Sequence, residues 1–105
     1  MKITVAPSLS EFVNSSDEKT KKLFKKQKEF MSLDPFYPSL GRTKLKNVVD
    51  KYNNPLWEVR LDKKRRIIYV EKDDTEIIWL RICSHDELKR NDKIIIRDCY
   101  GENTE

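Results

Sequence analysis

Three short apolar runs decide the fold of this chain: LWEVRL at 56–61, RRIIYV at 65–70 and IIWLRIC at 77–83. In the first run apolar and charged residues alternate, which is typical of a strand with one buried face. The polar segments Asp62–Lys64 and Asp73–Asp74 separate the runs and suit tight turns. Successive strands joined by short turns pair antiparallel, so the runs predict an antiparallel sheet.

The first third of the chain predicts one strand and two helices. Ile3–Ala6 is short and rich in β-branched residues, as a strand is. Two Ser-x-x-Glu patterns, beginning at Ser8 and Ser15, resemble capping boxes at the starts of a short helix and a longer one. In the longer helix apolar side chains recur at i, i+3, i+4 and i+7, and Asp34-Pro35 ends it.

The remaining segments carry weaker patterns. Residues 36–54 predict a loop that contains a short turn of helix at Leu45–Val49. Asp86–Arg90 suits a short helix, and Ile94–Ile96 suits a last edge strand or a docking segment. The predicted class is α+β, with a helical hairpin packed on one face of a small antiparallel sheet.

Length and composition limit the protein class. The 105 residues suit one domain, 1–105, in which 93–105 would form an extra strand and a tail. Hydrophobic residues make up 37% of the chain and cluster in short runs, which argues against disorder. No apolar stretch has the length of a signal peptide or a membrane span, so we expect a cytoplasmic protein. Cys83 and Cys99 lack metal-ligand spacing, and we expect no metal and no cofactor.

Positive charge is concentrated in the middle of the chain. Residues 42–66 hold nine Lys and Arg against three acidic residues, a balance of +6, whereas the whole chain has a net charge of +4. This distribution predicts a polyanion-binding surface in the middle segment. The lysines of 19–28 are expected only to solvate the outer side of a helix.

Alternation along the strands places the charged side chains. If Trp57 faces the helices, then Glu58 and Arg60 face the other way, because neighbouring side chains on a strand point to opposite sides. A helix layer on one side would leave that opposite face open to a ligand. The same alternation predicts that Arg81 lies on the side of Trp79.

These residue types suit the cutting of RNA by its own 2′-hydroxyl, a reaction that needs a base, an acid and fixed cations. His85, the single histidine, suits either proton transfer near neutral pH. Glu58, Asp86 or water would supply the other transfer. The cations are guanidinium groups, which bind phosphate bidentately and stay charged: Arg60, Arg66 and Arg81.

Each candidate has an ordinary structural alternative. His85 could cap the following turn or lie on the surface. Arg60 and Arg66 could form surface ion pairs with Glu58 or Asp62, and such pairs contribute little to stability. Three cations of the predicted hairpin turn are RNA-binding candidates, although solvated charge is the ordinary role of such a turn: Lys63, Lys64 and Arg65.

Six short motifs stand out along the chain: Asp34-Pro35, Pro38-Ser39-Leu40, Lys44-Leu45-Lys46, Trp57–Leu61, Arg66–Tyr69 and His85–Leu88. As a set they resemble the RelE/ParE superfamily of toxin–antitoxin toxins, and most closely the branch that includes YafQ and HigB. The resemblance runs from Leu9 to Leu88. It implies a helical hairpin on an antiparallel sheet and cleavage of mRNA in the ribosomal A site without a metal.

The resemblance also implies roles for single residues. Arg66 matches the family's arginine before a central strand, and Arg60 matches a basic strand position. Lys44 and Lys46 match a basic, RNA-binding loop, and His85 matches the catalytic histidine of the branches that have one. Family toxins are silenced by an antitoxin that wraps them, so the implied partners are an antitoxin, the ribosome and mRNA, with no membrane. The oligomeric state is left open.

Two alternatives remain within the family. The chain has no second histidine, and no aromatic residue lies close behind His85. ParE-type relatives share the fold but poison DNA gyrase and have no nuclease site. A degenerate member would bind only RNA or an antitoxin.

Overall fold

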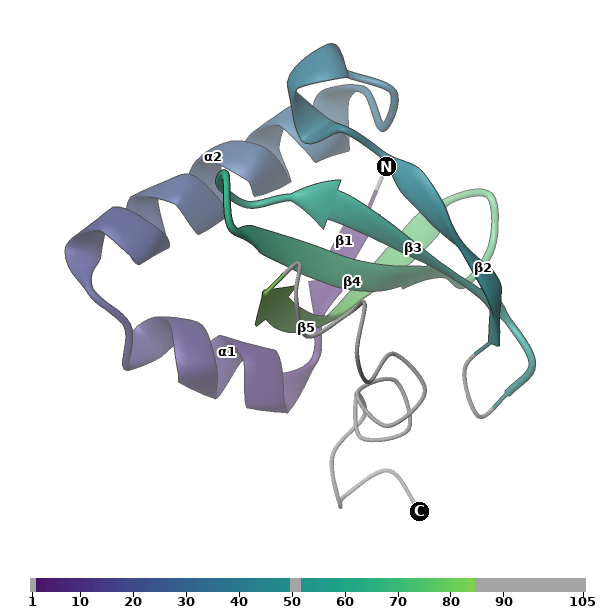
Figure 1. Cartoon of the computed structure of the whole chain (residues 1–105), viewed down its shortest axis with the longest axis horizontal. Helices are drawn as coiled ribbons and strands as arrows, with labels where there is room; N and C mark the ends of the chain where they lie inside the picture. The colour runs from purple at the N-terminus through teal and green to yellow at the C-terminus, as the bar shows by residue number, and fades with distance from the viewer. Residues whose placement is uncertain (1, 50–51, 85–105) are drawn as a thin grey trace.

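A five-stranded sheet with two helices on one face forms the protein (Figure 1). The computed structural model describes residues 2–49 and 52–84. The strands are β1 (Lys2–Val5), β2 (Thr43–Val49), β3 (Pro55–Arg60), β4 (Arg65–Glu71) and β5 (Glu76–Ser84). The helices are α1 (Pro7–Asn14), α2 (Glu18–Leu33) and a 3₁₀ turn, η1 (Pro38–Leu40). Within these ranges neither helix is long and apolar enough to cross a membrane.

The predicted α+β class is confirmed, but the sheet is mixed. Its strand order is β1-β5-β4-β3-β2, and β3, β4 and β5 pair antiparallel across the two predicted turns. β1 pairs with β5 in the parallel direction. Both helices and three other strands separate β1 from β5 along the chain, so no tight turn forces these two strands to be antiparallel.

The predicted turn of helix at Leu45–Val49 is wrong, because Thr43–Val49 forms the edge strand β2. β2 pairs antiparallel with β3, with an irregular register between Lys44 and Val49. A short edge strand rich in lysine has a weak local pattern, and it is defined mainly by the neighbour that accepts its hydrogen bonds.

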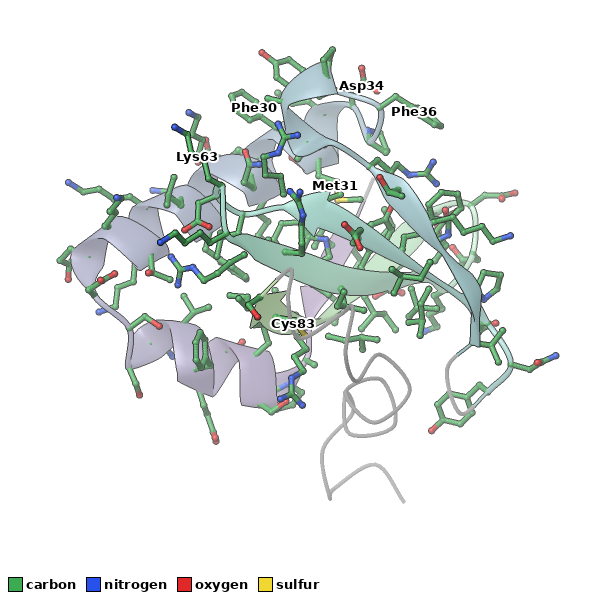
Figure 2. All side chains as sticks on the ribbon, viewed as in Figure 1. Phe30, Met31, Asp34, Phe36, Lys63 and Cys83 are labelled. Carbon is green, nitrogen blue, oxygen red and sulfur yellow. The ribbon has the colours of Figure 1, made fainter. Side chains whose placement is uncertain are left out.

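The core lies between the sheet and the helices, and Trp79 of β5 is fully buried in it. Its ring meets Phe24 of α2 edge-on, with 5.2 Å between ring centroids. The indole Nε1 donates to Met31 Sδ at 3.3 Å, and Met31 lies between α2 and the sheet (Figure 2). Gln27 of α2 is also buried and donates through Nε2 to the backbone oxygen of Arg60 at 2.5 Å. These contacts fix α2 across the sheet face that Trp79 occupies.

The helix ends differ from the predicted capping boxes. α1 has Ala6 at its N-cap with Pro7 next, and Ser8 makes no capping bond. α2 is capped by Asp17, whose carboxylate accepts from the backbone N–H of Thr20 at 2.8 Å, so a cap at Ser15 is wrong. Both predicted boxes are displaced because Pro and Asp at neighbouring positions begin a helix better. The predicted end at Asp34 is confirmed.

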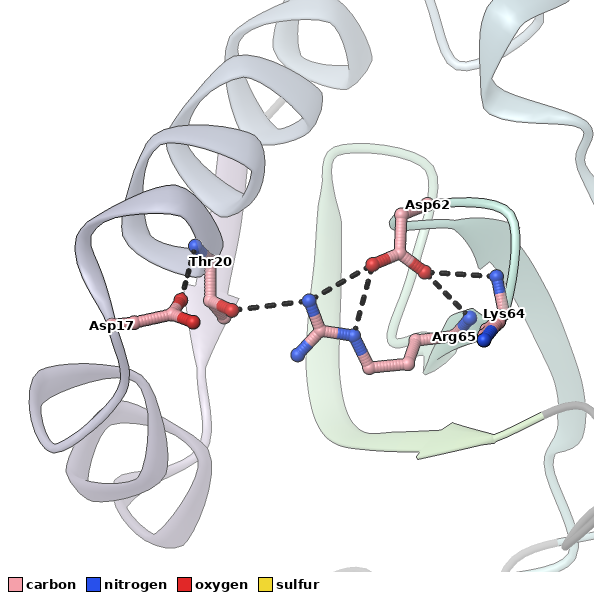
Figure 3. A network of polar contacts seen from close by, with 5 residues as sticks. All are labelled: Asp17, Thr20, Asp62, Lys64 and Arg65. Atoms are coloured by element: carbon pink, nitrogen blue, oxygen red, sulfur yellow. Dashed lines mark hydrogen bonds and ion pairs between the residues drawn. The ribbon is translucent and has the colours of Figure 1, made fainter.

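A network of polar contacts ties the β3–β4 turn to the start of α2 (Figure 3). The Arg65 guanidinium donates to Asp62 through Nε at 3.0 Å and Nη2 at 2.9 Å, and to Thr20 Oγ1 at 3.0 Å. The other oxygen of Asp62 accepts from the backbone N–H groups of Lys64 and Arg65. Burial opposes ionisation of Asp62, but these bonds outweigh it and hold its pKa below the ordinary value.

We expect Asp62→Asn to lower stability by about 1 kcal/mol or less at neutral pH. Because the pKa of Asp62 is depressed in the folded state, its contribution is present above the unfolded pKa of about 3.9 and is lost as the pH falls through the folded pKa. The melting temperatures of the unmodified protein and of Asp62→Asn should therefore converge as the pH is lowered. Asp74→Asn, in the other turn, is the matched control for the change of charge. A difference between Asp62→Asn and the unmodified protein that stays constant with pH would contradict the role of this carboxylate.

Several expectations fall outside the described residues. These are the site residues His85 and Asp86, the helix at Asp86–Arg90, the strand at Ile94–Ile96 and the tail 93–105.

Candidate active site

The candidate site is the sheet face that points away from the helices. Side chains at paired positions of neighbouring strands lie on the same face. One row across the sheet therefore consists of Arg60, Arg66 and Cys83, and the next row consists of Glu58, Ile68 and Arg81. The predicted orientation of Glu58 and Arg60 away from the helices is confirmed. These rows bring together four of the predicted catalytic residues on three strands: Glu58, Arg60, Arg66 and Arg81.

Arg81 reaches this face only because β5 contains a register shift. The prediction that Arg81 lies on the side of Trp79 is wrong. Tyr69 pairs with Trp79 while its neighbour Ile68 pairs with Arg81, so Leu80 is an extra residue in β5. Such a bulge interrupts the alternation of side chains. It moves Arg81 from the helix side to the row of Glu58.

Arg66 and Glu58 form the centre of the site. Arg66 Nε lies 3.4 Å from Glu58 Oε1, and their side chains are only 19% and 12% exposed. Arg66 Nε and Nη1 are shielded from solvent and have no hydrogen-bond partner among the described residues. A buried donor without a partner costs about 1–3 kcal/mol. These two N–H groups are therefore suited to anionic oxygens, one for each, because Nε and Nη1 donate toward different sides of the guanidinium.

Arg60 extends the positive charge toward β2. It is exposed and lies at the position paired with Arg66, where two like charges destabilise a sheet. Its guanidinium packs over Gly41, so that a Cβ there would lie 3.1 Å from Arg60 Nη2. Gly41 also has a φ of +57°, which favours glycine. A side chain at position 41 would therefore crowd the Arg60 guanidinium. Gly41 was not among the predicted site residues.

The face is not uniformly open. The row beyond Glu58 is apolar, with Leu56 and Val70 buried, and Ile68 and Cys83 are buried as well. On β3 and β4 the charged groups of this face are confined to the two arginine rows, whereas the β1–β5 edge adds Thr4 and Glu76. Counting Glu58 with its three arginine neighbours gives these rows a local charge of +2 within the described part of the chain. The geometry suits a phosphate more than a cation or an apolar ligand.

The predicted RNA-binding residues lie in other places. Lys44 pairs with Trp57, so its side chain leaves the sheet on the helix side, away from Arg66. Lys63 and Lys64 are exposed in the β3–β4 turn, and Lys63 is marked in Figure 2. Arg65 is engaged by Asp62 and Thr20, which favours a structural role, and its RNA contact stays a prediction. Lys46 belongs to β2, but its side chain is not described.

Arg42 was counted among the basic residues of 42–66, and no role was predicted for it. In the structure its role is structural. Its guanidinium stacks on Trp57 at 3.7 Å from the ring centroid, and its Nε donates to the Tyr69 hydroxyl at 2.7 Å. Nη2 also pairs with Glu71 at 2.5 Å. Burial raises the pKa of Tyr69 to about 12, although Arg42 opposes that shift. Arg42 thus fastens the start of β2 to β4 on the helix side of the sheet.

His85 comes directly after Ser84, the last residue of β5, and neither it nor Asp86 is among the described residues. Their placement relative to Arg66 therefore stays a prediction. Between residues 2 and 49 and between 52 and 84, no group of three His, Cys, Asp or Glu side chains is arranged to hold a metal ion.

Solved structures of toxins share this architecture. The archaeal RelE–RelB complex from Pyrococcus horikoshii OT3 aligns with a TM-score of 0.62 at 19% identity, over 79% of this chain and 92% of that one. The YoeB dimer from Staphylococcus aureus gives 0.61 at 19% identity, over 81% and 95%. A YoeB/ParE toxin from Agrobacterium tumefaciens gives 0.60 at 16% identity, over 81% and 99%.

Sequence comparison adds nothing to these likenesses, since no protein-family model and no curated protein matches the chain. At such low identity the solved structures establish the fold alone, and the YafQ/HigB branch stays a prediction. The chain has the fold of the RelE/ParE toxins, as the resemblance in its sequence predicted.

Proposed function

We propose that this protein is the toxin of a type II toxin–antitoxin system and cuts mRNA on the ribosome. The observation that carries the proposal is the Arg66 guanidinium, which has two shielded N–H groups without partners beside Glu58. Arg60 and Arg81 stand on the same face and add positive charge. The fold supports the proposal, since solved toxin structures share the same arrangement of two helices on one face of the sheet.

In the proposed reaction the 2′-oxygen attacks the adjacent phosphorus and the bond to the 5′-oxygen breaks. Arg66 contacts the phosphoryl oxygens, with Arg60 and Arg81 as further cations, and stabilises the charge that develops there. Glu58 is the described carboxylate beside Arg66 and is suited to accept the 2′ proton. His85 would then donate a proton to the leaving 5′-oxygen. Asp86 is the alternative carboxylate. No metal or cofactor takes part in this scheme.

The proposed partners follow from the same assignment. An antitoxin protein would hold the toxin silent, as RelB is bound to RelE in the archaeal complex. The ribosome would present the mRNA, and lysines would bind the RNA backbone with an affinity that falls as salt rises. The proposed RNA-binding lysines are Lys44, Lys46, Lys63 and Lys64. We place this activity in the cytoplasm.

Replacing His85 by alanine tests the proposal directly. We expect growth arrest on induction of the unmodified protein, with new mRNA 5′ ends that depend on translation. His85→Ala should reduce cleavage by about 10²–10⁴-fold, because a general acid–base group contributes that much. Circular dichroism would show that the fold is kept.

Three outcomes of that experiment are distinct. Loss of both mRNA cleavage and growth arrest in His85→Ala supports the nuclease. Growth arrest with intact mRNA and broken or relaxed DNA would instead assign a gyrase-directed toxin. Arrest with neither lesion would assign a protein that acts only by binding, and either of the last two results overturns the nuclease proposal.

A further inference from the structure

Helix α2 carries a net charge of +4, equal to that of the whole chain. The sequence holds 22 Lys and Arg against 18 Asp and Glu. α2 accounts for six lysines and two glutamates of these, so the rest of the protein has 16 of each and is neutral. The sequence alone attributed these lysines to solvation, and the basic segment 42–66 seemed the stronger candidate. In the folded protein α2 therefore presents a balance of +4 on one element, besides the +6 of residues 42–66.

The lysines are displayed on the side of α2 that points away from the sheet. The buried positions of the helix are Thr20, Phe24, Gln27 and Met31. The opposite side bears four exposed lysines, which we call the lysine face: Lys19, Lys22, Lys25 and Lys26. Lys21 pairs with Glu18 at 3.6 Å, whereas within the described residues no carboxylate forms an ion pair with a lysine of this face. Two acids lie on the same side: Glu18, one turn before Lys22, pairs with Lys21, and Glu29 lies one turn beyond Lys25.

An aromatic cluster continues the lysine face at the C-terminal end of α2. Lys26 Nζ lies 5.7 Å from the centroid of the Phe30 ring, and Phe30 stacks on Tyr37 with 4.5 Å between centroids. Phe36 is 71% exposed, and the Arg42 guanidinium lies 4.8 Å from its ring centroid. Figure 2 shows Phe30 and Phe36 on either side of the C-terminal end of the helix. The rings are held by stacking and by cations while part of their surface meets solvent.

From these observations we infer that the lysine face and the aromatic cluster form a second RNA-binding surface. The lysines would contact phosphates, and the rings of Phe36 and Tyr37 would stack with unpaired bases. Proteins that bind single-stranded RNA combine these two elements. The inference rests on the proposed function in that its ligand is RNA. It adds a second RNA segment, because α2 covers the sheet face opposite Arg66.

The observations favour RNA over an acidic polypeptide. An amphipathic peptide helix needs an apolar groove for its own apolar side chains. The lysine face is convex and carries no apolar side chain between Lys19 and Lys26. Over these residues a helix rises by roughly 10 Å, so the charges form a short row suited to a phosphate backbone. The apolar surface is confined to flat rings at one end, where a base can stack.

The test measures binding without cleavage. The probe is a fluorescein-labelled 2′-O-methyl RNA hairpin with a single-stranded tail, which has no free 2′-hydroxyl to attack. Affinity is measured by fluorescence anisotropy from about 50 to 200 mM salt. The variant is Lys22→Gln/Lys25→Gln. The control is Lys2→Gln/Lys72→Gln, which removes the same charge from two lysines outside α2 that each pair with Glu76 of β5.

We expect the α2 variant to bind roughly tenfold more weakly, and the slope of log affinity against log salt to fall by about 1.4. The control should change neither quantity appreciably. Phe36→Ala should weaken binding by about tenfold with an unchanged salt slope, because a stacked base is lost rather than a phosphate contact. Thermal unfolding checks that each variant is folded.

Equal effects of the two lysine variants would overturn the inference, since binding would then depend on net charge alone. It would also be overturned if the α2 variant lost affinity for a glutamate-rich peptide but kept its affinity for RNA. The outcome is separable from that of the proposed function. If the protein cleaves mRNA but the α2 variant has an unchanged salt slope, only the second RNA-binding surface is ruled out. If the α2 variant binds RNA as expected but the protein does not cleave mRNA, only the nuclease is ruled out.

Discussion

Arg66→Gln is expected to lower the rate of mRNA cleavage by about 10²–10³-fold, the loss typical when one donor to a developing anionic charge is removed. The guanidinium presents Nε and Nη1 to the face of the sheet with no described partner, and Glu58 lies 3.4 Å away. Glutamine can hydrogen-bond Glu58 but cannot supply the positive charge or the planar fork. Cleavage is measured on translated mRNA by mapping 5′ ends over time.

Two further variants sharpen that experiment. Arg66→Lys keeps the charge but not the bidentate geometry, and it should recover only part of the activity. Lys72→Gln removes one positive charge from the exposed β4–β5 turn and should cleave as the unmodified protein does. Because Glu58 loses its paired cation but can still accept a hydrogen bond from glutamine, Arg66→Gln should lower the free energy of unfolding by about 1–3 kcal/mol. Full activity in a folded Arg66→Gln protein would remove Arg66 from the mechanism.

Trp79→Ala is expected to lower the free energy of unfolding by about 3–5 kcal/mol. The side chain is fully buried, meets Phe24 edge-on and donates to Met31, so its removal leaves a cavity between the sheet and α2. A domain of this size is typically stable by about 5–15 kcal/mol, so the loss is a large fraction of the total. The change is measured by urea unfolding followed by circular dichroism.

Phe12→Ala is the matched control for the core. Phe12 is an aromatic residue of α1 with half of its surface exposed, and its loss should cost about 0.5 kcal/mol or less. Trp79→Phe should fall between the two, since it keeps an aromatic ring beside Phe24 but loses the donor to Met31. A cost for Trp79→Ala as small as that for Phe12→Ala would show that α2 is not packed on β5 as described.

Local pattern predicted most of the fold. The hairpins at Asp62–Lys64 and Asp73–Asp74, the end of α2 at Asp34 and the three central strands all follow from residues close together in sequence. Edge strand β2 did not, because its hydrogen bonds go to β3 and its own residues have no strong preference. The parallel pairing of β1 with β5 joins the two ends of the described chain, and no local signal encodes it.

The candidate site was likewise predicted only in part from the sequence. The alternation in LWEVRL by itself determined that Glu58 and Arg60 share one side of β3, because the pleat of a strand is a local property. The side of Arg81 was decided only by tertiary structure, since the extra residue Leu80 exists relative to the pairing of β5 with β4. The ion pair of Arg66 with Glu58 likewise depends on the pairing of β4 with β3. The sequence thus determined which residues carry the charge, whereas the sheet decided which of them meet, because a bulge and a register are properties of two strands rather than one.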